Sequence, residues 1–451
     1  QNGHGYVAYV FAHDEQSFGT DSDEAIIKCG SYTGASAHNI PLEVNVGFEP
    51  QWVLIKDTNN SARGWVLLDT MRGWAGATES SASSQWLRPD VNNAESGGTF
   101  GHLRPTGFVV NNSSYVNGSN NTFIYMAIRM THKPPTAGTD VLDIVSRTST
   151  NPNLFSTALL YVDLAWSKIT TGTHPDWLVS SRLTRQKYMS LNTTNQEATG
   201  SLIHYDYNYK IDPSTMSIGS AQINYLFKRA PGVFDVVAYR GNNSTQLVSH
   251  NLEAVPELII IKNRTSAAEW VIYESSIFAA QYSGTTTYTG YMRFSSGGSS
   301  FNPLDNVWPW NSTAPTSSTF SVGYSSNIGS DYQTNQSSKN YIAYLFATLE
   351  NVSKVGSYSG TGSNINVDCG FTGGARFVLI KRTDSSGDWY VWDTERGIVS
   401  GNDPYLLLNS DAVQVTNTDY IDPLNAGFTV TSSAPAALNT SGGTYLFLAI
   451  A

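Results

Sequence analysis

The chain has few of the residues that several classes of protein require. Only 14% of its 451 residues are charged, and only two are cysteine, Cys29 and Cys369. No run approaches 18 consecutive apolar residues, so no membrane insertion is expected. The net charge is −10 and lysine and arginine form no cluster, which argues against nucleic acid as a partner. Both cysteines stand where other repeats have valine, so we expect small buried thiols.

Motifs for catalysis are also lacking. The eight histidines are scattered, without a His-Glu-x-x-His pattern, and there is no Gly-x-Ser-x-Gly elbow or Walker-type loop. We therefore predict that the protein is not an enzyme, with no catalytic residues, no cofactor and no metal. Residues 21–24 (Asp-Ser-Asp-Glu) could bind Ca²⁺ through oxygen ligands, but the corresponding later segment keeps little of this charge, which favours a solvated loop.

The chain does contain a motif that occurs three times. An apolar run ends in lysine, a polar loop follows, and a second apolar run begins with tryptophan and reaches an acidic residue four positions later. The lysine-to-tryptophan spacing is nine, eight and eight residues. The motif residues are Trp52, Lys56, Trp65, Asp69 and Arg72, then Lys262, Trp270 and Glu274, then Lys381, Trp389, Asp393 and Arg396.

An aromatic, β-branched segment marks where each copy ends. It recurs with starts at residues 6, 123, 223, 341 and 445, which gives one compact domain per period. We predict four tandem domains at residues 14–133, 134–230, 231–350 and 351–451. Residues 1–13 would be the terminal strand of an upstream repeat, or a donor strand that pairs with a sheet edge in another subunit.

The composition predicts the fold class. Short runs rich in Val, Ile, Tyr, Phe and Trp lie between Gly, Asn, Ser and Asp clusters, and no segment has sustained helical periodicity. We predict an all-β protein of antiparallel, jelly-roll-like β-sandwich domains. The continuous apolar runs indicate strands covered on both faces. The second copy is divergent: we align residues 176–182 with the lysine-ending run, and find no Trp-x-x-x-Asp phrase.

The motif itself has two interpretations. A tryptophan beside an acidic residue and an arginine could hold a sugar by stacking and bidentate hydrogen bonds. Alternatively, the Asp and Arg pair with each other where the strand leaves the sheet, and the tryptophan is a core residue. We favour the structural interpretation, because a motif present in every domain usually specifies the fold.

Long polar loops are the other candidates for recognition. Loops of Asn, Ser, Thr and Gly with embedded aromatics resemble adaptable binding surfaces. The third copy carries the longest insertions. The candidate contacts for a glycan or a partner are Trp308, Trp310, Tyr324 and Tyr115.

The phrases Gly-Phe-x-Pro-Gln-Trp-Val-Leu-Ile-Lys, Trp-x-x-x-Asp-Thr-x-Arg-Gly and Phe-Ile-Tyr-Met-Ala-Ile-Arg carry a family resemblance. They resemble a repeat domain of structural proteins of tailed bacteriophages, especially phages of cyanobacteria and other aquatic bacteria. The resemblance covers residues 24–133 and 351–451 well, 232–350 fairly and 134–230 weakly.

The resemblance implies a virion protein, located on the tail or capsid exterior and thus extracellular. We expect a tail fibre or spike segment that forms a homotrimer, contacts other virion proteins and attaches to a host surface glycan. The alternatives are a capsid or tail decoration protein, a secreted bacterial adhesin, and a polysaccharide-degrading spike, which would need two carboxylates close together.

Overall fold

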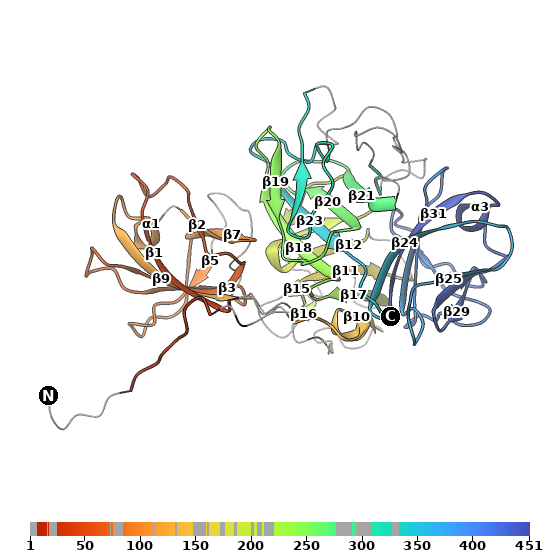
Figure 1. The fold of residues 1–451 in the computed structure, drawn as a ribbon, viewed down its shortest axis with the longest axis horizontal. Coiled ribbons are helices and arrows are strands. Elements are labelled where there is room, and N and C mark those ends of the chain that lie inside the picture. The colour runs from red at the N-terminus through yellow and green to blue at the C-terminus, as the bar shows by residue number, and fades with distance from the viewer. Residues whose placement is uncertain are drawn as a thin grey trace. The chain divides into compact units, whose positions relative to one another are not determined.

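The computed structural model is all-β with antiparallel sheets, which confirms the predicted fold class (Figure 1). Among the described residues, the helical elements are single turns, and no helix is long and apolar enough to cross a membrane. The helical turns are α1 (Ser114–Asn117), η1 (Gly138–Asp140), η2 (Arg182–Thr184) and α3 (Ala436–Asn439). The structure describes residues 7–15, 17, 25–72, 74, 84–111, 113–130, 133–147, 159, 162–171, 176–184, 187–199, 203–204, 210–211, 221–276, 291–294, 309–326 and 333–451.

The chain divides into two compact units. The first unit comprises Gln1–Trp74 and Thr78–Lys133, and the second comprises Ala75–Ala77 and Pro134–Ala451. Below, copies 1 to 4 denote the sequence ranges 14–133, 134–230, 231–350 and 351–451. Copy 1 thus lies in the first unit, and copies 2, 3 and 4 lie in the second.

Copy 4 shows how one copy is built. Its first sheet has the order β24-β31-β26-β27-β28 and its second sheet the order β25-β30-β29. The strands are β24 (Ser353–Ser359), β25 (Ile365–Asp368), β26 (Phe377–Arg382), β27 (Trp389–Asp393), β28 (Leu406–Leu407), β29 (Ile421–Leu424), β30 (Gly427–Val430) and β31 (Thr444–Ile450).

The core of copy 4 lies between these two sheets. Because side chains alternate along a strand, only every second residue of β26 faces inward. Val378 and Ile380 join the core with Phe428 of the second sheet, while Phe377 and Leu379 point to the opposite face. Phe377 and Leu379 are nevertheless fully buried, so the outer face of this sheet is covered as well.

The same order of four strands occurs in all four copies. The first strand pairs with the last, the last with the lysine-bearing strand, and that strand with the strand that begins at the motif tryptophan or directly after it. The strands are β1 (Ile27–Thr33), β9 (Thr122–Arg129), β3 (Pro50–Asp57) and β4 (Val66–Asp69) in copy 1; β10 (Leu142–Arg147), β17 (Gln222–Phe227), β11 (Leu164–Ile169) and β12 (Leu178–Ser181) in copy 2; and β18 (Phe234–Arg240), β23 (Asn340–Phe346), β20 (Leu258–Asn263) and β21 (Trp270–Glu274) in copy 3.

The remaining strands extend these sheets or form smaller ones. Copy 1 has a second sheet of order β2-β8-β7, and copy 3 has the pair β19-β22. Their bounds are β2 (Leu42–Asn45), β7 (Gly101–Arg104), β8 (Gly107–Val110), β19 (Gln246–Ser249) and β22 (Thr319–Val322). The others are β5 (Ser84–Trp86), β6 (Ser96–Gly98), β13 (Lys187–Ser190), β14 (Ala198–Thr199), β15 (Ile203–His204) and β16 (Lys210–Ile211).

The sequence alignment of copy 2 was wrong. Leu164 pairs with Ser181, in the register in which Phe377 pairs with Asp393 in copy 4. Residues 178–181 are therefore the second strand of the hairpin, and not the lysine-ending run. The lysine-ending run is β11, and Lys168 precedes Trp177 by nine residues, the same spacing as in copy 1. Copy 2 keeps the lysine and the tryptophan, whereas Ser181 replaces the acidic residue and Thr184 replaces the arginine.

Residues 7–12 form no strand within the described part of the chain. Val7, Tyr9 and Val10 are 82–89% exposed. Just after them, the Asp14 amide donates a hydrogen bond to the Ile27 carbonyl (2.8 Å), next to the start of β1. The expectation that this segment pairs with another chain, or with an upstream repeat, stays a prediction.

Candidate functional site

The motif lysine lies buried beside the loop of the hairpin in copies 2, 3 and 4. Lys168 and Lys262 are 0% exposed and Lys381 is 2% exposed. A buried ammonium needs hydrogen-bond acceptors, and Lys262 Nζ donates to the Ala268 carbonyl (2.6 Å). Lys381 donates in the same way to the Gly387 carbonyl. In both copies the acceptor lies two residues before the tryptophan, so the lysine fastens the hairpin loop to the sheet.

Burial also changes the protonation of these lysines. Desolvation disfavours the charged ammonium, and it lowers the pKa values of Lys168, Lys262 and Lys381 to about 8. Nearby carboxylates oppose this effect only in part; Glu269 does so for Lys262, and Asp388 for Lys381. The three lysines of the second unit thus lose their protons at a lower pH than exposed lysines do.

The motif tryptophans bind one copy to the next. The indole N–H of Trp177 in copy 2 donates to the Leu407 carbonyl of copy 4 (2.8 Å). The indole of Trp389 in copy 4 donates to the Arg293 carbonyl of copy 3 (3.1 Å). The indole of Trp270 in copy 3 donates to the Ser190 carbonyl of copy 2 (2.9 Å). Each of the three copies donates once and accepts once, so the contacts form a closed ring.

The three acceptors are equivalent positions of the fold. Leu407 pairs with Tyr390 and Ser190 pairs with Leu178, which are the residues that follow the motif tryptophans Trp389 and Trp177. In copy 3 the bridge between Ile272 and Met292 brings the next residue, Arg293, opposite Val271. The ring therefore uses one type of interface three times.

Two lysines reinforce the same interfaces. Lys168 donates to the Asp411 carbonyl of copy 4 (2.7 Å), and Lys262 donates to the Thr194 carbonyl of copy 2 (3.0 Å). Asp411 and Thr194 each lie four residues after the carbonyl that accepts from tryptophan. The lysine and tryptophan of one hairpin thus bind a single short segment of the neighbouring copy.

Aromatic side chains pack between the copies. Phe227 of copy 2 contacts Phe346 of copy 3 with ring centroids 5.9 Å apart, and Phe377 of copy 4 at 6.3 Å. Trp389 of copy 4 packs edge-on against Phe294 of copy 3 (4.9 Å). These rings explain why the outer faces of the three sheets are as buried as their inner faces.

The acidic residue and the arginine of the motif pair with each other. Asp393 accepts hydrogen bonds from the Arg396 backbone N–H (2.8 Å) and from its Nε (2.5 Å). Asp69 and Arg72 pair in the same way in copy 1. The Tyr225 hydroxyl of copy 2 donates to Asp393 (2.7 Å), so this pair also joins two copies. In copy 3, Glu274 accepts from the Ser276 N–H (2.9 Å).

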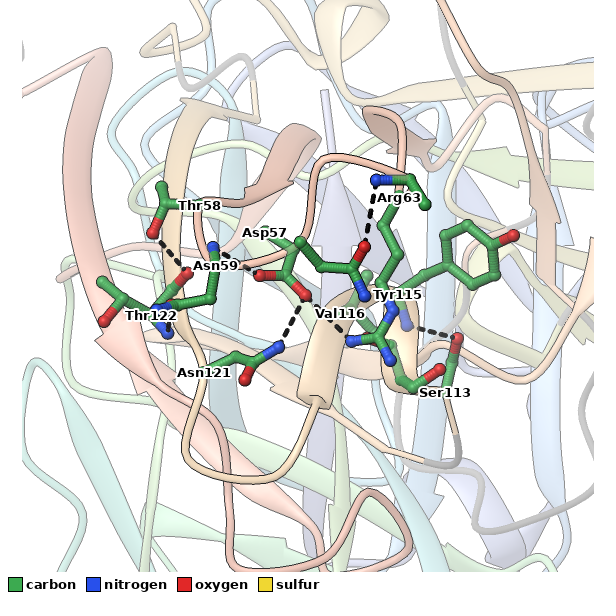
Figure 2. A network of polar contacts seen from close by, with 12 residues as sticks. Asp57, Thr58, Asn59, Arg63, Ser113, Tyr115, Val116, Asn121 and Thr122 are labelled. Atoms are coloured by element: carbon green, nitrogen blue, oxygen red, sulfur yellow. Dashed lines mark hydrogen bonds and ion pairs between the residues drawn. The ribbon is translucent and has the colours of Figure 1, made fainter.

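In the first unit a polar network fixes the tip of the β3–β4 hairpin (Figure 2). Asp57 accepts from Arg63 (2.8 Å) and Asn121 (2.9 Å), and Arg63 also donates to the Ser114 carbonyl of α1 (2.7 Å). Burial alone would raise the pKa of Asp57, but these hydrogen bonds and the one from the Asn59 N–H outweigh it, and the pKa lies below its ordinary value. Lys56 donates to the Arg63 carbonyl, which lies two residues before Trp65. The equivalent lysines in copies 3 and 4 donate to the carbonyl at the corresponding position.

The candidate contact residues lie in different environments. Trp310 is 2% exposed and packs against Tyr273 (5.4 Å), so it is a core residue, and its assignment to a glycan-binding surface was wrong. Tyr324 is partly buried. Tyr115 in α1 is also partly buried, 5.8 Å from the ring of Trp86. Trp308 lies outside the described residues.

The remaining predicted features concern metal and thiol chemistry. Residues 21–24, the candidate Ca²⁺ loop, lie outside the described residues. Within the described part, no three His, Cys, Asp or Glu side chains are grouped as metal ligands. Both cysteines are free: Cys369 is buried, which raises its pKa to about 12, and Cys29 is half-buried.

Comparison with known protein families identifies the family of this chain. A family model described as a domain of unknown function (DUF7483) matches residues 1–131 and 229–451, more than half of the chain. The chain belongs to this family. The unmatched stretch corresponds to copy 2, which nevertheless has the strand order of the other copies. No curated protein matches the chain.

Sequence reasoning missed Lys168, Trp177 and Tyr225. The spacing of nine residues between Lys168 and Trp177 could have identified the first two, because copy 1 has the same spacing. Nothing local distinguishes Tyr225, because its partner Asp393 lies 168 residues away in the sequence.

Proposed function

We propose that this protein is a structural component of a tailed-phage virion, a tail fibre or spike segment that contributes to attachment to a host surface glycan. The observation that carries the proposal is the use of the repeated motif. Its lysine, tryptophan and aspartate side chains bind β-domains to one another in a closed ring. A chain whose repeated polar groups are used for assembly has the properties of a rigid building block.

Two sequence properties support the virion assignment. The motif phrases resemble those of tailed-phage structural proteins. The surface has little charge and many polar loops, which suits contact with a neutral glycan and disfavours nonspecific binding to nucleic acid. An acidic net charge also keeps such an exposed protein soluble.

The virion assignment is tested on purified phage particles. Mass spectrometry of gradient-purified virions should detect peptides of this chain at the level of other structural proteins. Gold-labelled antibodies against the chain should then decorate the tail fibres or spikes in electron micrographs. Label on the capsid would indicate a decoration protein instead of a tail fibre. Absence of the chain from purified particles would overturn the proposal.

Attachment is best tested at Tyr115 in the first unit. Its partly buried ring lies beside that of Trp86, and adjacent aromatic rings form an apolar platform with polar edges. We predict that Tyr115→Ala weakens binding of the purified chain to host surface polysaccharide several-fold in a pull-down assay. Tyr115→Phe, which keeps the ring, should retain binding. Equal binding by the wild type and Tyr115→Ala would exclude this platform.

A further inference from the structure

The outer face of the first sheet is buried in each copy of the second unit. In copy 4 this face includes Leu379, Trp389, Val391 and Leu446, all 0–1% exposed. The equivalent positions in copies 2 and 3, identified by strand register, are also 0% exposed, for example Ile223 and Ile342 at the position of Leu446. Neighbouring copies of the ring cover all three faces.

The first unit has the same face, and within that unit it is covered only in part. The residues equivalent to the ring contacts are partly exposed, and they are Trp52, Leu54, Trp65, Leu67, Met126 and Ile128. Ile124, which stands at the position of Leu446, is 41% exposed. The inner face of this sheet is buried as in the other copies, since Val53 and Ile55 are 0% exposed. The exposure is therefore confined to the face that mediates contacts between copies.

The groups that form the ring contacts are present in copy 1 in the same register. The bridge between Leu67 and Leu87 brings Arg88 opposite Val66, as Arg293 lies opposite Val271 in copy 3. The Arg88 carbonyl is thus the equivalent of the acceptor in each ring contact, and Trp65 is the equivalent donor. Copy 1 has both halves of the interface.

The ring itself cannot supply the partner through this interface. Its three donors and three acceptors satisfy one another, so in the described part of the second unit these groups are already paired within the chain. A face with distinct donor and acceptor sides forms heterologous contacts, which close into a ring when the rotation permits. In the second unit the rotation closes after three copies. The matching faces left over are those of the first unit in other chains.

We propose that three chains associate through the outer sheet face of their first units, in the arrangement that copies 2, 3 and 4 adopt within one chain. The indole N–H of each Trp65 donates to the Arg88 carbonyl of the next chain. Lys56 reaches the Asn92 carbonyl of that chain, four residues beyond Arg88, as Lys262 reaches Thr194. This inference does not depend on the virion role.

The test is the mass of the full chain in solution, measured by light scattering or sedimentation equilibrium over a range of concentrations. The expected result is three times the chain mass of 49.1 kDa. A monomer at high micromolar concentration, or a dimer, would overturn the proposal.

Three variants assign the interface. Ile124→Arg places a charge on a side chain that is already exposed in the single chain, so the fold tolerates it and the trimer does not form. Ile40→Arg is the matched control, at a residue 46% exposed outside the first sheet, and it should remain trimeric. Trp65→Phe keeps the packing and removes the N–H, and it should raise the dissociation constant at least tenfold. A folded Ile124→Arg variant that is still trimeric, or an unchanged constant for Trp65→Phe, would exclude this face.

Discussion

At the residue scale, the most informative feature is the lysine buried in each hairpin of the second unit. Lys262 is enclosed with carbonyl partners, and desolvation lowers its pKa to about 8. In the unfolded chain the pKa of a lysine is about 10.4. Between these values the unfolded state binds more protons, so stability rises with pH.

We predict that Lys262→Met reduces this pH dependence. The free energy of unfolding of the wild-type second unit should increase between about pH 8 and pH 10, and the variant should lose up to about 1.4 kcal/mol of that increase per pH unit. Urea denaturation at several pH values measures the slope. Lys187→Met, at a side chain 40% exposed, is the control. Equal slopes for wild type and Lys262→Met would contradict the assignment.

A second buried group, His102, makes the first unit sensitive to acid. Desolvation, with a smaller effect of the nearby Arg104, lowers its pKa to about 3, and it is 3% exposed. The unfolded chain takes up a proton near pH 6.5, so stability falls as the pH drops from there toward 3. His102→Leu should weaken this loss, by up to about 1.4 kcal/mol per pH unit. Thermal melts at pH values from 7 to about 4 measure it, with exposed His38→Gln as control. An unchanged acid slope in His102→Leu would contradict the prediction.

At the scale of the element, the hairpin tip is fixed by a buried carboxylate. Asp57, the last residue of β3, accepts hydrogen bonds from Arg63 in the following loop and from Asn121, which directly precedes β9. Asp57→Ala would leave several donors without an acceptor, and we predict a loss of about 2–4 kcal/mol in the first unit. Hydrogen exchange of residues 57–64 should become faster. Asp90→Ala breaks a more exposed pair with Arg88 and should destabilise the first unit much less. Equal losses in the two variants would show that the network does not fix the loop.

At the scale of the whole molecule, the second unit behaves as one assembly because three copies share a closed set of contacts. Trp177→Phe, Trp270→Phe and Trp389→Phe each remove one indole N–H and thus one hydrogen bond between copies. We predict a loss of about 1–3 kcal/mol for each in denaturant unfolding of the second unit. Trp65→Phe should have almost no effect on the second unit. A stable Trp177→Phe variant would exclude copy 2 from the ring.

Much of this architecture could be predicted from the sequence, because it depends on local patterns. The period of the repeats, the all-β class and the Lys-to-Trp hairpin all follow from apolar runs and their spacing. Copy 2 was misaligned because Ser181 replaces the acidic residue, and because its lysine-ending run contains Ser167. Trp310 was placed at the surface because its neighbours in the sequence are polar, although its ring lies in the core.

The sequence by itself determined that the strands carry apolar side chains on both faces, since they are apolar at consecutive positions. Only the tertiary structure decided what covers the outer faces. The contacts that do so join residues far apart in the chain, such as Trp177 and Leu407, and depend on how whole copies are oriented. Identical motifs therefore have different surroundings: Trp270 and Trp389 are buried between copies, while Trp65 is partly exposed, because copies 2, 3 and 4 close a ring within one chain and copy 1 lies in a unit of its own.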